Sequence, residues 1–319
     1  MNSASPASAA APAAGRRFRK VAVLMGGPSS ERDISIESGR SVAAALREAG
    51  YDAVEVLAGR DRSFSLPAGV EAVFPALHGE WGEDGGAQAA LEALGVPYVG
   101  CRPDAARVSF DKTLTREAFA RAGVPIPRGG TYFPARAGDF APPVPIPLVV
   151  KPPRQGSSVG VSIVSEETQW APAVAAALEY GPDVVVEEFI PGREWTVPLL
   201  GAGEPLPIVE IRPKTGWYDF GAKYSDDAGT EYVFPEDSDD PAESELCARA
   251  REIAAAAYRA VGGRDFGRVD LRVSPDGGIF ALENNSIPGC TGHSLLPKAA
   301  AKAGIPFPAL CARLVEGAA

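Results

Sequence analysis

The sequence predicts an α/β fold of three units, the first of which contains an open sheet of parallel strands. In the first hundred residues short apolar runs alternate with helical periodicity, a pattern typical of parallel strands joined by helices. A later segment, residues 268–285, alternates polar and apolar side chains around a turn and predicts a hairpin. With 319 residues and 45% hydrophobic content, the chain is long enough to bury more than one core.

The first unit, residues 18–100, begins with a buried strand at residues 21–25 that runs into a Gly-Gly-Pro turn. A helix follows, and Gly50 stands where its C-terminal cap belongs. Its apolar residues at helical spacing are Val42, Ala45, Leu46 and Ala49. Further strands are expected at residues 53–57 and 72–75. The first turn lacks the full GxGxxG pattern and the chain has no GxxxxGK[ST] motif, which excludes a dinucleotide fingerprint and a P-loop.

The second unit, residues 101–189, is expected to open with a helix from residues 109–112 to Gly123. After a Pro-rich connector, its strands are expected at 148–151, 161–164 and 184–189, with a helix at 171–179. The third unit, residues 190–319, contains a helix that starts at Asp240-Pro241, with Glu243 as a capping-box residue, and runs to residue 262. The hairpin and a terminal helix over residues 297–316 complete it.

Composition excludes several classes of function. A net charge of −10 argues against a nucleic-acid partner, which needs a basic surface, and no apolar run is long enough to span a membrane. The four cysteines lack metal-ligand spacing and are expected to be free thiols in a reducing cytoplasm. Residues 1–17 are mostly Ala, Ser and Pro and are predicted to form a disordered tail that ends in the basic GRRFRK stretch and has no role in the fold.

The hairpin carries the strongest chemical signal. Its period of two places Glu283 and Asn285 on one face, and Asp270 should lie opposite residues 282–284. Two carboxylates and an amide form an oxygen-only site that suits Mg²⁺, which takes its other ligands from water and phosphates. A solvated polar face is an equally good interpretation of the hairpin alone.

Other polar segments indicate a phosphate and nucleotide site. Lys151 ends a strand directly before the Gly/Ser-rich loop 152–160, whose backbone N–H groups and hydroxyls could approach phosphate oxygens. Lys112 stands at a helix start. The acidic residues of segment 187–194 could bind an adenine amino group and ribose hydroxyls. An ordinary turn and ordinary charges at a strand end remain the alternatives for each motif taken alone.

Two loops and one long polar segment remain. His78 and His293 each lie in a Gly-containing loop without a zinc-type partner at i+4, so a zinc site is not expected. The segment at about 214–235 contains Lys223 and Tyr224 and has the composition of a functional lid.

The order of these motifs resembles that of the ATP-grasp enzymes, and the finer match is similar to the D-alanine–D-alanine ligase family. The matching stretches, which cover nearly the whole chain after the tail, are GGPSSERDIS, ALHGEWGEDG, FDK, VVKPPRQGSSVGVS, VVVEEF, GREWTV, YDFGAKYSD, GRVDLRV, ENNSIPG and TGHSLLP. Gln155 and Asn284 depart from the residues common in the family, and neither departure removes a ligand. The resemblance implies a three-domain ATP-grasp architecture, with the nucleotide between the central and C-terminal domains.

The resemblance also implies a role for each site residue. D-alanine should contact Glu31, His78, Arg268, Gly289, Ser294 and Leu295. ATP should contact Lys112, Lys151, Glu187, Glu188, Phe189, Glu194, Lys223 and Asn285. Two Mg²⁺ ions, which Mn²⁺ could replace, should be held by Asp270, Glu283 and Asn285. The catalytic set should be Glu31, Ser157 and Tyr224 as a hydrogen-bonded trio, with Arg268 and the Gly289 N–H at the oxyanion.

The implied activity is the ATP-dependent ligation of two D-alanine molecules through an acyl phosphate, by a cytoplasmic homodimer that supplies a peptidoglycan precursor. Two alternatives stay open on the sequence. A non-catalytic nucleotide-binding relative would have lost ligands, and this chain retains them. A ligase that uses D-lactate, D-serine or another amino acid as its second substrate is the closer rival.

Overall fold

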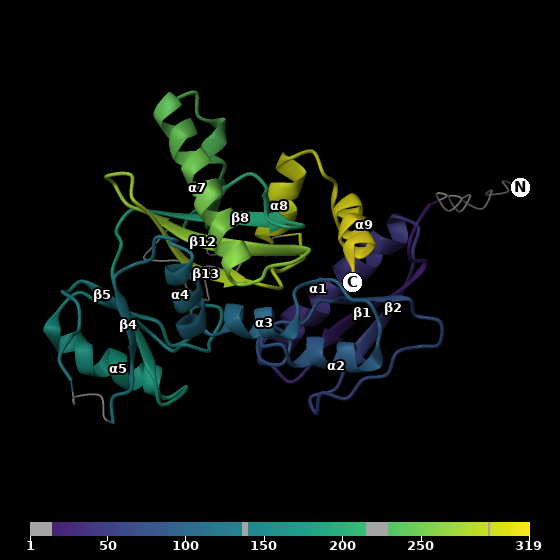
Figure 1. Cartoon of the computed structure of the whole chain (residues 1–319), viewed down its shortest axis with the longest axis horizontal. Coiled ribbons are helices and arrows are strands. Elements are labelled where there is room, and N and C mark those ends of the chain that lie inside the picture. Colours follow the sequence, from purple (N-terminus) through teal and green to yellow (C-terminus); the bar gives the residue numbers. More distant parts are fainter. Residues whose placement is uncertain (1–14, 136–139, 215–228, 293) are drawn as a thin grey trace, which may run out of the picture.

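The structure, a computed structural model, describes residues 15–135, 140–214, 229–292 and 294–319, which form three sheets (Figure 1). The four-stranded sheet with α5 lies at one end of the molecule and the three-stranded sheet lies at the other. The largest sheet, with α7 on it, lies between them. Among the described residues, no helix combines the length and apolar composition that crossing a membrane requires.

The first sheet is parallel, as the sequence predicts. Its strands are β1 (Lys20–Gly26), β2 (Asp52–Ala58) and β3 (Ala72–Pro75), in the order β2-β1-β3. Alternate residues of β1 enter different cores: Val21 and Val23 pack with α1 (Arg32–Glu48), and Ala22 and Leu24 with α2 (Gly86–Leu94). Gly50 follows α1 with a φ of 86°, the left-handed conformation expected of a C-terminal cap.

The second unit is an antiparallel sheet reached through two short helices. The helices are α3 (Pro103–Phe110) and α4 (Lys112–Arg121), and the first was not predicted. The sheet has the order β4-β7-β5-β6 and is completed by η1 and α5. These elements are β4 (Gly129–Tyr132), β5 (Leu148–Lys151), β6 (Ser162–Val164), η1 (Glu167–Gln169), α5 (Trp170–Leu178) and β7 (Val184–Glu188). The predicted strands and helix are therefore confirmed to within one or two residues.

The third unit contains the largest sheet, in the order β11-β10-β8-β12-β13 with β9 paired to β8. Its strands are β8 (Arg193–Leu200), β9 (Glu204–Pro205), β10 (Val209–Arg212), β11 (Glu231–Val233), β12 (Phe266–Val273) and β13 (Ile279–Asn285). The predicted hairpin is β12–β13, and Asp270 pairs with Glu283. A bulge follows that pair, because Leu271 pairs with Ala281 and leaves Leu282 as an extra residue.

Two expectations for the helices of this unit are wrong. The terminal helix is two helices, α8 (Leu295–Lys302) and α9 (Phe307–Gly317). Gly304 adopts a φ of 77° between them, and Pro306 cannot donate a helical hydrogen bond, so one continuous helix is not possible. On α7 (Pro241–Ala260), which follows the 3₁₀ turn η3 (Pro235–Asp237), Asp240 caps Ala242 as predicted. Glu243 instead pairs with Arg193 and forms no capping box.

The basic stretch after the tail has a role in the fold, which corrects the prediction that it has none. Arg16 lies over the Tyr51 ring at 4.4 Å, and the backbone N–H of Arg17 donates to Glu316 at 2.9 Å. Phe18 is buried in the largest core. The partners come from α9 and from the residues after α1, so the local sequence could not indicate them.

The largest core crosses the predicted boundary between the first and third units. It joins residues of β1 and α1 to residues of α8, α9 and the large sheet, and Phe74 contacts Phe266 with ring centroids 5.9 Å apart. In Figure 1, α9 and α1 lie side by side, and the two helices are in contact. The first sheet is therefore fixed against the sheet that carries the β12–β13 hairpin.

Candidate active site

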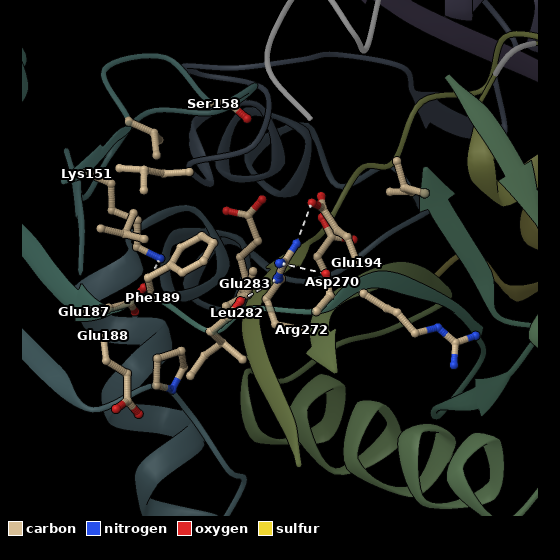
Figure 2. Close-up of a pocket in the computed structure, with 18 of the residues that line it drawn as sticks. Lys151, Ser158, Glu187, Glu188, Phe189, Glu194, Asp270, Arg272, Leu282 and Glu283 are labelled. Atoms are coloured by element: carbon tan, nitrogen blue, oxygen red, sulfur yellow. Dashed lines mark hydrogen bonds and ion pairs between the residues drawn. The ribbon is translucent and has the colours of Figure 1, made fainter. Parts of the chain in front are cut away.

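A cavity of about 650 Å³ lies between the four-stranded sheet and the largest sheet, a volume typical of a small-ligand site. Lys151 and Glu187 line it from β5 and β7, while Asp270 and Glu283 line it from the hairpin, and Figure 2 shows these groups around one space. Its other charged and polar lining residues are Lys112, Gln155, Ser158, Glu188, Arg193, Glu194, Glu210, Arg212 and Arg272. The structure thus brings together residues that the sequence separates by up to 171 positions, from Lys112 to Glu283.

On the β5–β7 side, Glu187 is buried between two cations. Its Oε2 lies 2.5 Å from Lys151 Nζ, and its Oε1 accepts a hydrogen bond from Arg116 Nη1. Arg116 is held in turn by the Pro127 carbonyl at 3.0 Å. Both oxygens of Glu187 are therefore engaged, and the carboxylate fixes the position of Lys151.

The segment that follows β7 is held by Arg272 of the hairpin. Arg272 donates to the carbonyls of Ile190 and Gly192 at 3.1 and 3.0 Å and lies 5.9 Å from the Phe189 ring centroid. It also pairs with Glu194 at 3.4 Å. Glu188 turns to Arg128 instead, with Oε2 2.7 Å from Nε. Two of the predicted nucleotide contacts, Phe189 and Glu194, are thus fixed by one arginine that the sequence analysis did not select.

On the hairpin, the Asp270 carboxylate accepts four hydrogen bonds. Arg268 donates two of them, each 2.9 Å long, and Thr196 Oγ1 and Asn285 Nδ2 donate the others at 2.5 and 3.0 Å. Glu283 Oε2 lies 3.2 Å from Lys112 Nζ, which also donates to the Gln155 carbonyl at 2.7 Å. The predicted juxtaposition of Asp270, Glu283 and Asn285 is therefore present, with Arg268 and Lys112 as their cationic partners.

The hairpin oxygens fit a hard divalent cation. Asp270 and Glu283 both line the cavity, and Asn285 donates from its amide nitrogen to Asp270, which places a third hard oxygen, that of the amide, beside them. Among the described residues, no group of three or more His, Cys, Asp or Glu could hold a metal by itself. Two carboxylates and one amide supply three oxygen ligands, and phosphate oxygens or water would complete six. This coordination is typical of Mg²⁺ and not of zinc.

A smaller cavity of about 20 Å³ adjoins the hairpin, and its lining includes Glu83, Ser109, Gln155 and Asn285. His78 is buried nearby, with Nδ1 3.5 Å from Glu83 Oε1 and Nε2 3.2 Å from Ser38 Oγ. Burial raises the pKa of Glu83, although the hydrogen bond with His78 opposes the shift. The sequence analysis missed Glu83, and its position five residues after His78 in the same loop was the signal available.

The predicted pair of Glu31 and Ser157 is present, because Ser157 Oγ donates to Glu31 Oε1 at 2.6 Å. Ser157 and Ser158 both have positive φ, 49° and 63°, a strained conformation that is typical of ligand-binding loops. Gly79 is required beside them, since a Cβ there would lie 2.2 Å from Ser29 Oγ. The predicted lid segment, with Lys223 and Tyr224, falls mostly on residues 215–228, outside the described residues.

The loop after the hairpin is compact. Ser294 Oγ accepts a hydrogen bond from the Thr291 N–H at 3.0 Å, and a Cβ at Gly289 would lie 2.7 Å from that same oxygen. Leu295 buries its side chain in the largest core, so only its backbone N–H, in the first turn of α8, could bind a carboxylate. His293 lies outside the described residues.

Comparison with known proteins matches two family models to this chain. The model described as D-ala D-ala ligase C-terminus covers residues 140–316, and the model described as D-ala D-ala ligase N-terminus covers residues 61–101. The first of these regions includes both sides of the larger cavity except Lys112 and Pro127.

Curated relatives match over nearly the full chain. A D-alanine–D-alanine ligase from Methylibium petroleiphilum is 42% identical over 95% of this chain and 97% of the relative. One from Cereibacter sphaeroides is 44% identical with the same coverage.

Solved structures give the same result. D-alanine–D-alanine ligase from Bacillus anthracis, complexed with ATP, superposes with a TM-score of 0.79 at 31% identity, over 94% of this chain and 97% of that one. The VanG D-Ala:D-Ser ligase from Enterococcus faecalis gives a TM-score of 0.80 at 28% identity, over 94% and 99%.

Proposed function

The chain belongs to the D-alanine–D-alanine ligase family, which joins two D-alanine molecules with ATP. We propose that its 650 Å³ cavity binds the nucleotide and that D-alanine binds beside it, at Glu31 and at the loop after the hairpin. One observation carries the proposal. The hairpin carboxylates and the lysines from two other elements line one cavity of ligand size, as a triphosphate site requires. The related structure complexed with ATP supports the same use of the cavity.

In this proposal the nucleotide spans the two sheets. Lys112 and Lys151 neutralise phosphate oxygens, together with Lys223 from outside the described residues. Glu187 and the backbone of Glu188 and Phe189 contact adenine, and Glu194 accepts hydrogen bonds from ribose hydroxyls. Glu187 has a second role, since its carboxylate already holds Lys151 at 2.5 Å.

Asp270, Glu283 and Asn285 would hold Mg²⁺ ions, and Mn²⁺ would suit the same oxygen ligands. When bound, the metal would offset the negative charge of the phosphates as a carboxylate approaches them. Arg268 remains next to Asp270, so its guanidinium is positioned beside the phosphate end of the cavity.

The reaction then has two steps. A carboxylate oxygen of the first D-alanine attacks the γ-phosphorus of ATP, the bond to the β-phosphate oxygen breaks, and an acyl phosphate and ADP result. The amine of the second D-alanine attacks the carbonyl carbon and forms a tetrahedral oxyanion, which Arg268 and the Gly289 N–H stabilise. Phosphate leaves and the amine loses a proton, which gives the dipeptide.

The first D-alanine is proposed to lie with its ammonium against Glu31 and its carboxylate toward the hairpin. Ser157 holds Glu31 at 2.6 Å, and His78 contacts Glu83 on the wall of the smaller cavity. The carboxylate of the second D-alanine would bind Ser294 and the Leu295 N–H, where the helix dipole of α8 favours an anion.

We also propose that the protein acts in the cytoplasm as a homodimer and supplies D-alanyl-D-alanine for peptidoglycan. ATP is a cytoplasmic substrate, and all four cysteines are buried free thiols, which agrees with a reducing compartment. The dimer follows the family resemblance, and size-exclusion chromatography with light scattering tests it.

Phosphate release from ATP tests the function directly. We expect release that requires D-alanine and Mg²⁺ together, with the dipeptide identified by mass spectrometry. L-alanine, and D-alanine in excess EDTA, serve as controls. Because the VanG D-Ala:D-Ser ligase has an equally similar fold, D-serine and D-lactate belong in the panel. Turnover that is equal with L-alanine, or that is faster with D-serine as acceptor, would contradict the proposal.

A further inference from the structure

Arg154 is the one charged residue of the loop 152–160, and its side chain makes its contacts away from both cavities. Its Nη1 donates to Asp111 Oδ2 at 3.1 Å and to Asp183 Oδ2 at 3.0 Å, and its Nη2 donates to Asp183 Oδ1. Loop residues Gln155 and Ser158 line the larger cavity directly. Arg154 therefore acts on the cavity only through the loop that it holds.

The two carboxylates that Arg154 joins stand at the starts of two other elements. Asp111 is the N-cap of α4, where its Oδ1 accepts the N–H of Thr113 at 2.9 Å while Oδ2 accepts Arg154. Asp183 is buried and directly precedes β7. One guanidinium thus connects the loop to the element that carries Lys112 and to the strand that carries Glu187.

Lys112 donates hydrogen bonds to the same loop on both sides of Arg154. Its backbone N–H donates to the Pro153 carbonyl at 2.9 Å, and its Nζ donates to the Gln155 carbonyl at 2.7 Å. Lys112 Nζ also lies 3.2 Å from Glu283 of the hairpin. The position of loop residues 153–155 therefore sets the distance between a phosphate-binding lysine and the hairpin.

The charges make this arrangement sensitive to Arg154. Asp111 and Asp183 are both mostly buried, and they share a single guanidinium. Without it, neither carboxylate would have a cationic partner among the described residues, which disfavours their ionised forms and their close approach. A lysine could pair with one of them but lacks the planar fork that spans both.

We propose that Arg154 is a positioning residue for nucleotide binding, which sets the spacing of Lys112, the 152–160 loop and the Lys151–Glu187 pair around the larger cavity. The proposal rests on the proposed function of that cavity as the ATP site. Arg154 itself does not contact the nucleotide, and its effect passes through the loop and the N-cap of α4.

The test compares Arg154→Gln and Arg154→Lys with the wild type. We expect Arg154→Gln to raise the KM for ATP and the Kd for Mg-ADP, measured by titration calorimetry, by about tenfold, as for the loss of a charge-assisted hydrogen bond. Arg154→Lys should show a smaller rise in both, and kcat should change less than the KM for ATP in each variant. The matched control is Arg121→Gln on α4, because Arg121 is exposed and, in the described part of the chain, pairs with Glu117 alone.

A double variant, Arg154→Gln with Asp183→Asn, distinguishes the loss of positioning by Arg154 from the effect of an unpaired carboxylate at Asp183. It removes the unpaired carboxylate, so we expect it to recover thermal stability lost in Arg154→Gln while its ADP affinity stays weak. Folded Arg154→Gln with ADP affinity and ATP KM within twofold of the wild type would overturn the proposal. Recovery of ADP affinity in the double variant would also overturn it. A wild type that binds no Mg-ADP would instead refute the ATP site, and this role with it.

Discussion

The two sides of the larger cavity hold their charges in different ways. On the β5–β7 side, Glu187 is 3% exposed and its partners Lys151 and Arg116 are 8% and 9% exposed. On the hairpin side, Asp270 and Glu283 are 14% and 27% exposed, and each lies beside a cation and the open cavity. The first side is a closed, buried cluster, while the second can exchange a protein partner for a ligand.

This difference predicts which substitutions should mainly reduce stability and which should mainly reduce activity. Removal of one partner from a buried ion pair leaves an uncompensated charge, so its main cost falls on folding. Pairs that border an open cavity contribute less to folding, because water can replace part of the lost partner. Their charges are therefore available for chemistry, and substitutions there should change turnover more than stability.

The largest effect is expected for Asp270→Asn on the hairpin. It removes a charge proposed to bind metal while it keeps the shape, so kcat should fall by on the order of 10³-fold, the scale of metal-assisted charge stabilisation. The free energy of unfolding should fall by less than in Glu187→Gln, because Asp270 borders the open cavity and the asparagine keeps part of its hydrogen bonding. Phosphate release and urea titration measure the two quantities. Near-wild-type turnover would refute the metal assignment, and a large loss of stability would break the comparison.

Glu187→Gln should show the opposite balance. Arg116 and Lys151 would face each other without a counter-charge, so the free energy of unfolding should fall by about 3–5 kcal/mol. Glu188→Gln is the matched control, because its partner Arg128 is largely exposed and the change should stay below about 1 kcal/mol. Urea titration of both variants decides the matter. Equal changes in the two would remove the distinction between an acid with buried partners and one with an exposed partner.

Arg268→Ala should lower kcat by on the order of 10²-fold, the usual effect of losing a donor to an oxyanion. The KM for ATP should rise by a smaller factor, since the interaction proposed for Arg268 strengthens in the transition state. Steady-state kinetics with ATP and D-alanine varied in turn separate the two. An increase in the KM for ATP alone would indicate that Arg268 binds the nucleotide and does not stabilise the oxyanion.

The smallest effect concerns Glu83, an acid that belongs to neither side. Burial raises its pKa above the ordinary 4.5, so the fold favours the protonated carboxyl. Its contribution to stability is fully present below pH 4.5 and is lost as the pH rises through the raised value. The wild type should therefore lose stability relative to Glu83→Gln between pH 4.5 and neutrality. Thermal unfolding of both across that range measures it, and parallel curves would contradict the shift.

The sequence predicted most of what depends on local patterns. The alternation of residues 268–273 predicted the hairpin and its buried face, and placed Asp270 opposite residues 282–284; the structure fixes the partner as Glu283. The parallel first sheet and the N-cap at Asp240 were also predicted, because capping and strand patterns are local.

Several of the missed contacts involve partners that are distant in sequence. Arg116 pairs with Glu187 across 71 residues, and Asp183 pairs with Arg154 across 29. Arg272 was recognised as part of a strand, but its contacts to Ile190 and Gly192 depend on how two sheets pack. No single-sequence pattern encodes such distances, so these pairings were not predicted.

The packing of α9 on α1 has a consequence for the order in which the protein can fold during synthesis. Residues of α9, including Leu310, Leu314 and Val315, complete the core that β1 and α1 begin. A ribosome adds about 5–20 residues per second, so the first sheet emerges many seconds before this cover is made. Until then part of the core that β1 and α1 begin stays uncovered, and we expect this region to depend on chaperones or to fold last although it is translated first.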